Sequence, residues 1–179
     1  MSKSGKVVVA FRASRRRIDC SEKRGVLGRF GLSAWRATGA KLWLPIFLAL
    51  KAQAQAKGGY GEVALQTIEQ AITVSNETNE RWAIAEVLRL KADLLLASGL
   101  ARPDEIEELL VDSLEIARTQ KARSWELRTA CDLARLRQEQ GRWNEAASLL
   151  QASYGQFTEG LESPDLKCAK MLLDRCFAQ

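Results

Sequence analysis

A glycine-led pattern of small and large side chains near the C-terminus constrains the fold of this chain more than any other feature. The pattern consists of Gly141, Trp143, Glu145, Ala146, Leu150 and Ser153. Steps of three and four residues place Ala146, Leu150 and Ser153 on one face of a helix. The small residues let a neighbouring helix approach closely, and Leu150 fills the remaining space. Residues 141–154 are therefore predicted to form the turn and second helix of a helical hairpin.

Two earlier copies of the pattern make the chain a repeat array. One copy follows Gly59 and the other follows Gly99. The helix expected before each copy also repeats, because Ala52, Ala92 and Ala134 stand 40 and 42 residues apart. A tryptophan stands near the start of each of these helices, at Trp43, Trp82 and Trp125. Self-similarity at this period predicts an all-α solenoid of about three antiparallel hairpins.

The helix boundaries follow from the turn residues. The expected hairpins comprise residues 41–57 with 62–75, 80–98 with 103–118, and 124–140 with 143–157; residues 76–79 are expected to form a turn, and residues 29–38 the end of a helix. Ser163 and Pro164 are an N-cap and a first helical residue, and they start a last amphipathic helix over 165–177. We expect that unpaired helix to cover the apolar end of the stack as a C-terminal cap. The acidic residues Asp104, Glu105, Glu107 and Glu108 are interpreted as complements of a helix N-terminus.

The composition argues against a membrane protein and against a metal-binding protein. No apolar stretch reaches the roughly 18–20 residues of a membrane span, so we expect a soluble, cytoplasmic protein without membrane contact. The chain has 4 cysteines and no histidine, and no C-x-x-C spacing. Reduced, incidental thiols are therefore expected, and neither a metal nor another cofactor is predicted.

The positive charge is concentrated at the N-terminus. Residues 1–30 hold nine Lys and Arg against Asp19 and Glu22, whereas the whole chain carries a net charge of +5. We expect a basic, disordered arm over 1–30 and a helical domain over 31–179, with a short strand at 6–11 or a processed leader as alternatives for the arm. Clustered arginines at 15–17 attract phosphates. Because no stacking platform accompanies them, nucleic-acid binding through the arm is only the alternative function.

The repeated residues resemble the tetratricopeptide repeat. Gly141, Trp143, Glu145-Ala146 and Leu150 match the family's turn glycine, turn aromatic, Glu-Ala pair and large apolar position. The period departs from the standard 34, and Ile106 and Ser113 occupy two small-residue positions of the middle copy. Longer helices than those of the standard repeat are implied.

A second resemblance covers residues from about 31 to 179. Residues 31–40, 42–45 and 156–167 look like the C-terminal helical region of large bacterial signalling ATPases, some of which carry a class III adenylate/guanylate cyclase or a DNA-binding domain. The chain has no G-x-x-x-x-G-K-[ST] phosphate loop. The resemblance therefore implies a fragment or a separately encoded remnant of such a protein.

These features predict a non-enzymatic scaffold for protein interactions. Without histidine or a nucleophile motif, no catalytic residue is predicted. In tetratricopeptide arrays the first helices line a concave groove for a protein or peptide partner, and the resemblance carries that groove to Gln53, Glu86, Arg89, Asp93, Arg128, Arg135 and Gln138. The same residues would also suit a solvated face without a ligand, and both interpretations stay open. Homo-oligomerisation through the N-terminal flank near Trp35 and Trp43 is a further expectation.

Overall fold

The structure of the chain is a computed structural model, which describes residues 37 and 42–178. The basic arm, the possible strand at 6–11, most of the helix expected at 29–38 and Trp35 lie outside the described residues. The described helices are α2 (Leu44–Lys57), α3 (Gly61–Thr78), α4 (Ile84–Ser98), α5 (Pro103–Thr119), α6 (Arg123–Glu139), α7 (Trp143–Tyr154) and α8 (Pro164–Phe177). None of the described helices is long and apolar enough to cross a membrane.

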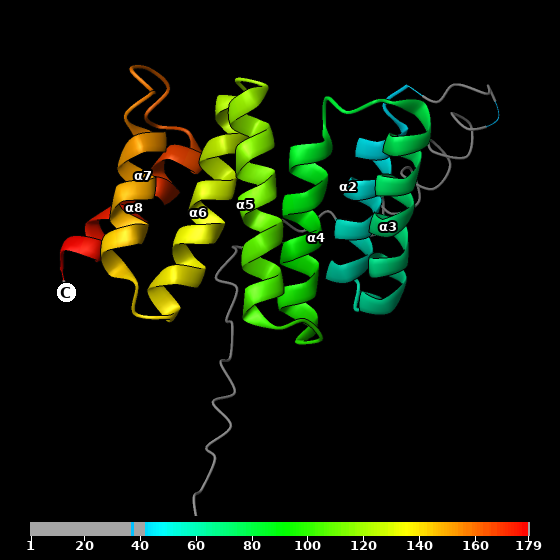
Figure 1. The fold of residues 1–179 in the computed structure, drawn as a ribbon, viewed down its shortest axis with the longest axis horizontal. Helices are drawn as coiled ribbons and strands as arrows, with labels where there is room; N and C mark the ends of the chain where they lie inside the picture. Colours follow the sequence, from blue (N-terminus) through cyan, green and yellow to red (C-terminus); the bar gives the residue numbers. More distant parts are fainter. Residues whose placement is uncertain (1–36, 38–41, 179) are drawn as a thin grey trace, which may run out of the picture.

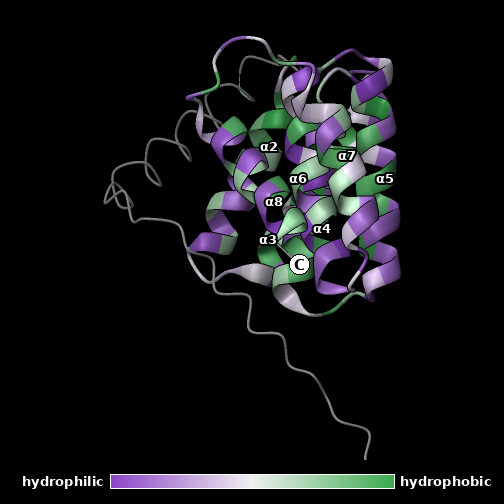
Figure 2. Cartoon of the chain, turned by 90° about the vertical axis from the view of Figure 1, so that its left-hand side faces the viewer, coloured by the Kyte–Doolittle hydropathy of each residue, from purple (hydrophilic) through white to green (hydrophobic). Residues whose placement is uncertain are grey.

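The helices form three antiparallel hairpins and a final single helix. The pairs α2–α3, α4–α5 and α6–α7 stand side by side in chain order, and α8 packs on α6 and α7 (Figure 1). The predicted all-α solenoid with a C-terminal capping helix is therefore confirmed. Figure 2, which views the stack from its α8 end, shows hydrophilic residues on much of the outer surface of the helices.

The turns contain the residues that the sequence indicated. Gly99 and Gly141 adopt φ values of 65° and 78°, a left-handed conformation that a side chain disfavours, so each helix before them ends there. Ser163 accepts a hydrogen bond from the Leu166 amide and precedes Pro164, as expected for an N-cap. The backbone amide of Arg102 donates to the Glu105 carboxylate, so this acid caps α5.

Four boundaries differ from the prediction by three or four residues: α2 begins at Leu44 instead of 41, α7 ends at Tyr154 instead of 157, and the other two lie between α3 and α4. The turn expected at 76–79 is mostly helical, because α3 continues to Thr78 and ends at Asn79, whose φ is 54°. The helix expected from residue 80 begins only at Ile84. The reason is local: the Glu80 carboxylate accepts hydrogen bonds from the Trp43 amide and the Trp82 indole, which hold residues 80–82 outside the helix.

Three apolar clusters hold the hairpins together. Each cluster connects one hairpin to its neighbour: the first joins α2 and α3 to α4, the second joins α4 and α5 to α6 and to Leu149 of α7, and the third joins α6 and α7 to α8. Ala52, Ala92 and Ala134 are at most 1% exposed. Burial of each large aliphatic side chain contributes about 1.5–3 kcal/mol, and this gain depends on the neighbouring hairpin being in place.

Candidate functional site

One layer of the stack consists of α2, α4, α6 and α8, which we call the inner helices. Each inner helix contacts the next one in the layer, whereas α3, α5 and α7 do not contact one another within the described chain. All of the predicted groove residues lie on three of the inner helices, α2, α4 and α6, so the inner helices form the face on which the groove was predicted.

Four of the predicted groove residues lie together on α4 and α6. Arg89 donates from Nε and Nη2 to the two Glu86 oxygens, each at 2.8 Å. Arg128 reaches the same carboxylate from α6, with Nη1 at 3.5 Å from Glu86 Oε1. Glu86 and Arg89 are 7% and 8% exposed. This buried ion pair is thus part of the junction between α4 and α6.

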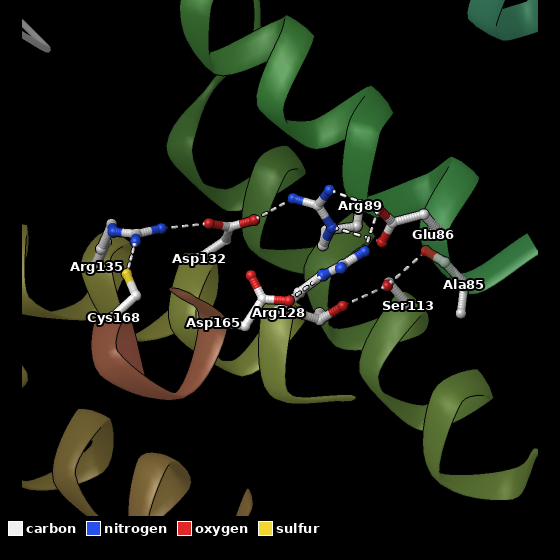
Figure 3. Close-up of polar contacts among 10 residues, drawn as sticks. Ala85, Glu86, Arg89, Ser113, Arg128, Asp132, Arg135, Asp165 and Cys168 are labelled. Atoms are coloured by element: carbon white, nitrogen blue, oxygen red, sulfur yellow. Dashed lines mark hydrogen bonds and ion pairs between the residues drawn. The ribbon is translucent and has the colours of Figure 1, made fainter. Parts of the chain in front are cut away.

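Two carboxylates that the sequence reasoning did not select complete the network. Asp132 on α6 accepts from Arg89 Nη1 at 2.7 Å and also from Arg135 (Figure 3). Asp165 on α8 accepts from Arg128 Nε at 2.6 Å. Asp132 stands four residues after Arg128 and three before Arg135, a helical spacing that could have indicated it. The sequence indicates Asp165 only as an acid in the first turn of a helix.

The remaining three predicted residues are placed differently. Gln53 on α2 and Asp93 on α4 are half-buried. Gln138 is 6% exposed, and its amide donates to the Leu172 carbonyl at 3.0 Å and to Cys176 Sγ at 2.9 Å. Because both acceptors belong to α8, Gln138 lies beneath the capping helix and not on an open surface.

Each arginine of the network has a carboxylate partner. Its three arginines, on α4 and α6, face the carboxylates of Glu86, Asp132 and Asp165. Burial alone would lower the pKa of Arg89, but its hydrogen bonds and attraction to Glu86 and Asp132 raise that pKa overall. Arg89 therefore keeps its charge, and its hydrogen bonds go to Glu86 and Asp132 within the fold.

The outer part of the network is more accessible. The side chains of Arg128 and Asp165 are 41% and 43% exposed, and that of Arg135 is 32% exposed. Exposed ion pairs contribute little to stability, about 0–1 kcal/mol, so these groups can exchange partners at small cost. The arrangement can present charged hydrogen-bonding groups to a ligand, while the described residues contain no cluster of three His, Cys, Asp or Glu suited to a metal.

A row of tryptophans marks one edge of the inner layer. The rings of Trp43 and Trp82 lie 4.7 Å apart, and those of Trp82 and Trp125 lie 5.8 Å apart. Trp43 has a φ of 66°, a strained value for a bulky residue, and its amide donates to Glu80 at 2.6 Å. The repeated tryptophans therefore contact one another from one hairpin to the next, edge to face between Trp43 and Trp82 and tilted between Trp82 and Trp125.

A hollow lies between α5, α6 and α7. It has a volume of about 430 Å³ and is lined by Arg118, Lys121, Arg123, Glu126, Ala152 and Gln156. Glu126 accepts hydrogen bonds from Arg118 and Gln156, each at 3.1 Å. The carboxylate of Glu126 thus already balances part of the positive charge in this hollow. The inner face therefore remains the better candidate for a binding site.

Comparisons with known proteins agree with the fold. The TPR-like repeats of a kinesin-light-chain-like protein from Podosopora anserina superpose with a TM-score of 0.62, at 21% identity over 88% of this chain and 78% of that one. A single-substitution variant of those repeats gives a TM-score of 0.64, at 20% identity over 88% and 77% of the two chains. No protein-family model and no curated protein matches the chain. At this identity the similarity establishes the architecture: the chain is a TPR-like α-solenoid.

Proposed function

We propose that the chain is a non-enzymatic scaffold that binds an extended, polar segment of a partner protein across its inner helices. The observation that carries the proposal is the row of partly exposed charges on α6 and α8, namely Arg128, Arg135 and Asp165. Buried Glu86 and Arg89 hold this row in place from below. TPR-like solenoids are a common architecture for holding other proteins.

The chemistry of the partner follows from the two arginines. A guanidinium group binds a carboxylate through two parallel, charge-assisted hydrogen bonds. A partner carboxylate can replace Asp165 on Arg128 because both of these side chains are partly exposed. The partner segment is therefore extended and carries acidic side chains opposite α6, with polar groups opposite α2 and α4, where Gln53 and Asp93 lie.

A displayed library of extended peptides tests this proposal. Peptides selected on the full chain are measured against an Arg128→Ala/Arg135→Ala variant and against an Asp112→Ala/Glu115→Ala control, whose exposed residues lie on α5. We expect the first variant to weaken binding at least tenfold, which corresponds to about 1.4 kcal/mol, and the control to leave it unchanged. Equal binding to both variants, or selection of no acidic peptide, contradicts the proposed site.

The origin of the chain is also a proposal. The resemblance of residues 31–179 to the helical region of bacterial signalling ATPases supports descent from such a protein and a role in signalling. The described cysteines are free thiols, which suits the reducing cytoplasm. A phosphate loop or a cyclase domain in the neighbouring reading frame would support this origin, and a neighbourhood without either would count against it.

Self-association through the α2 end of the stack is a further proposal. Trp43 and Leu50 are 46% and 51% exposed there. Light scattering of the wild-type chain and of the Leu50→Glu variant measures the molar mass, and hence the oligomeric state, directly. We expect the wild type to be larger than the variant, and a wild-type monomer at all concentrations contradicts this proposal.

A further inference from the structure

Two cysteines and one arginine meet where the capping helix contacts α6. Cys168 is half-buried on α8, and its sulfur accepts a hydrogen bond from Arg135 Nη2 at 2.7 Å (Figure 3). Cys131 lies on α6 and is 5% exposed. Both cysteines belong to the apolar cluster that joins α8 to the third hairpin. The two thiols thus come from different helices and differ in their access to water.

The surroundings make the two thiols unequal. A hydrogen bond from the Cys131 thiol and the charge of Arg135 lower the pKa of Cys168 to about 6, although burial and Asp132 act in the opposite direction. The same hydrogen bond, together with burial, raises the pKa of Cys131. At neutral pH, a partly accessible thiolate therefore lies beside a buried protonated thiol, and only the thiolate is a nucleophile.

We propose that Cys168 is a peroxide-reactive thiolate and that Cys131 resolves its oxidised form into a disulfide between α6 and α8. In the first step the Cys168 thiolate attacks hydrogen peroxide, the O–O bond breaks, and a sulfenic acid and hydroxide form. In the second step Cys131 transfers its proton to the sulfenic oxygen, its sulfur attacks the sulfenic sulfur as a thiolate, and the S–O bond breaks. The Cys131 proton leaves with the departing oxygen as water. Peroxide is reduced by two electrons, and the two thiols are oxidised.

Oxidation would change both the cap and the inner face. The disulfide ties α8 covalently to α6, where apolar packing and hydrogen bonds hold it in the reduced protein. Arg135 loses its sulfur anion and keeps Asp132 as a carboxylate partner. The inner face therefore gains one unit of positive charge on oxidation. This inference concerns the thiols themselves and does not depend on the proposed partner.

Peroxide treatment of the full chain tests the oxidation. Cys20 and Cys176 are first replaced by serine, so that only the proposed pair remains. Peptide mapping without reductant is expected to find a Cys131–Cys168 disulfide. A further Cys131→Ser change is expected to stop the reaction at a sulfenic acid that dimedone traps on Cys168, and a Cys168→Ser change to leave Cys131 reduced. Persistence of both free thiols, or oxidation of Cys131 in the Cys168→Ser variant, overturns the proposal.

The role of Arg135 is tested by the pH dependence of alkylation. In the chain with only the proposed pair, the rate of Cys168 labelling by iodoacetamide is expected to have its midpoint near pH 6. Arg135→Gln should move the midpoint toward the ordinary cysteine value of about 8.5, and Arg135→Lys should restore part of the shift. A merely structural arginine would not move this midpoint. A wild-type midpoint at about the ordinary cysteine value contradicts the proposed thiolate.

Discussion

Ala52, Ala92 and Ala134 are the equivalent buried alanines of the three hairpins. The residue three positions before this alanine differs from one end of the stack to the other. In the first hairpin it is Ala49, which is fully buried in an apolar cluster. In the second hairpin it is Arg89, which is also buried but is bonded to two carboxylates. In the third it is Cys131, beneath the capping helix. One backbone position thus accommodates three kinds of interface.

This difference separates two ways of joining helices. The α2 helix joins α4 within an apolar cluster that includes Leu48 and Ala52, and apolar burial has no directional requirement. The junctions of α4 with α6 and of α6 with α8 instead contain hydrogen bonds from Arg89 and Arg128, which require a defined geometry. We infer that the charged junctions fix how the second half of the stack is aligned, while the apolar junction mainly supplies stability.

Removal of one buried charge should produce the largest effect. Arg89→Met leaves Glu86 buried without its main partner and takes one partner from Asp132. Breaking a buried pair in this way costs about 3–5 kcal/mol, which urea unfolding would measure. The matched control is Arg102→Met, which breaks an exposed pair with Glu105 and should leave the unfolding midpoint unchanged. Equal midpoints for the wild type and Arg89→Met would show that the network does not hold α4 to α6.

The buried hydroxyls test the same junction on a smaller scale. Ser113 on α5 donates to the Ala85 carbonyl at 2.7 Å and shares a hydrogen bond of 2.9 Å with Thr129 on α6. Ser113→Ala leaves buried polar groups unsatisfied and should cost about 1–3 kcal/mol, measured by urea unfolding. Addition of Thr129→Val should recover part of the loss, because it removes one unsatisfied hydroxyl. If the two losses simply add, the hydroxyls do not act as a pair.

Sequence reasoning identified the elements that depend on local periodicity. The spacing of Ala52, Ala92 and Ala134 indicated the hairpins, because these positions face the same kind of neighbour in each repeat. The start of α4 was predicted too early. Glu80 was counted as helical, although its carboxylate accepts hydrogen bonds from Trp43 and Trp82 outside the helix. The contact with Trp43 joins residues 37 positions apart, and no local pattern reveals it.

The candidate site was predicted less completely than the fold. Glu86, Arg89, Arg128 and Arg135 lie together on the inner helices α4 and α6, and their role in binding a partner stays a prediction. Alignment did not predict that Asp132 pairs with Arg89, because this pairing depends on the distance and rotation between two hairpins. Gln138 was assigned to the groove because the repeat pattern does not show where α8 packs. Side-chain pairing between repeats, rather than helix formation, was therefore the missing information.

A partly exposed cluster at the other end of α6 should give the smallest effect. Glu107 on α5 accepts from Arg137 Nε at 3.0 Å and from Arg142 Nη1 at 2.6 Å. Burial raises the pKa of Glu107, but the hydrogen bonds from Arg142 and Arg137 outweigh it and lower the pKa below its ordinary value of 4.5. Because the folded state lowers this pKa, Glu107 stabilises the fold above pH 4.5, and the contribution is lost as the pH falls below that value.

The expected loss for Glu107→Gln is below about 1 kcal/mol at neutral pH, since partly exposed pairs contribute little. The difference in melting temperature between wild type and variant should shrink as the pH falls below the ordinary glutamate pKa of 4.5 and the wild-type carboxylate becomes protonated. Glu108→Gln is the matched control, because the exposed Glu108 makes no ion pair with the described residues. A difference that persists unchanged in acid would show that Glu107 acts through packing. In that case the contact of Glu107 with Arg137 and Arg142 would be held mainly by shape, and the contrast with the apolar α2 junction would rest on the hydrogen bonds of Arg89 and Arg128.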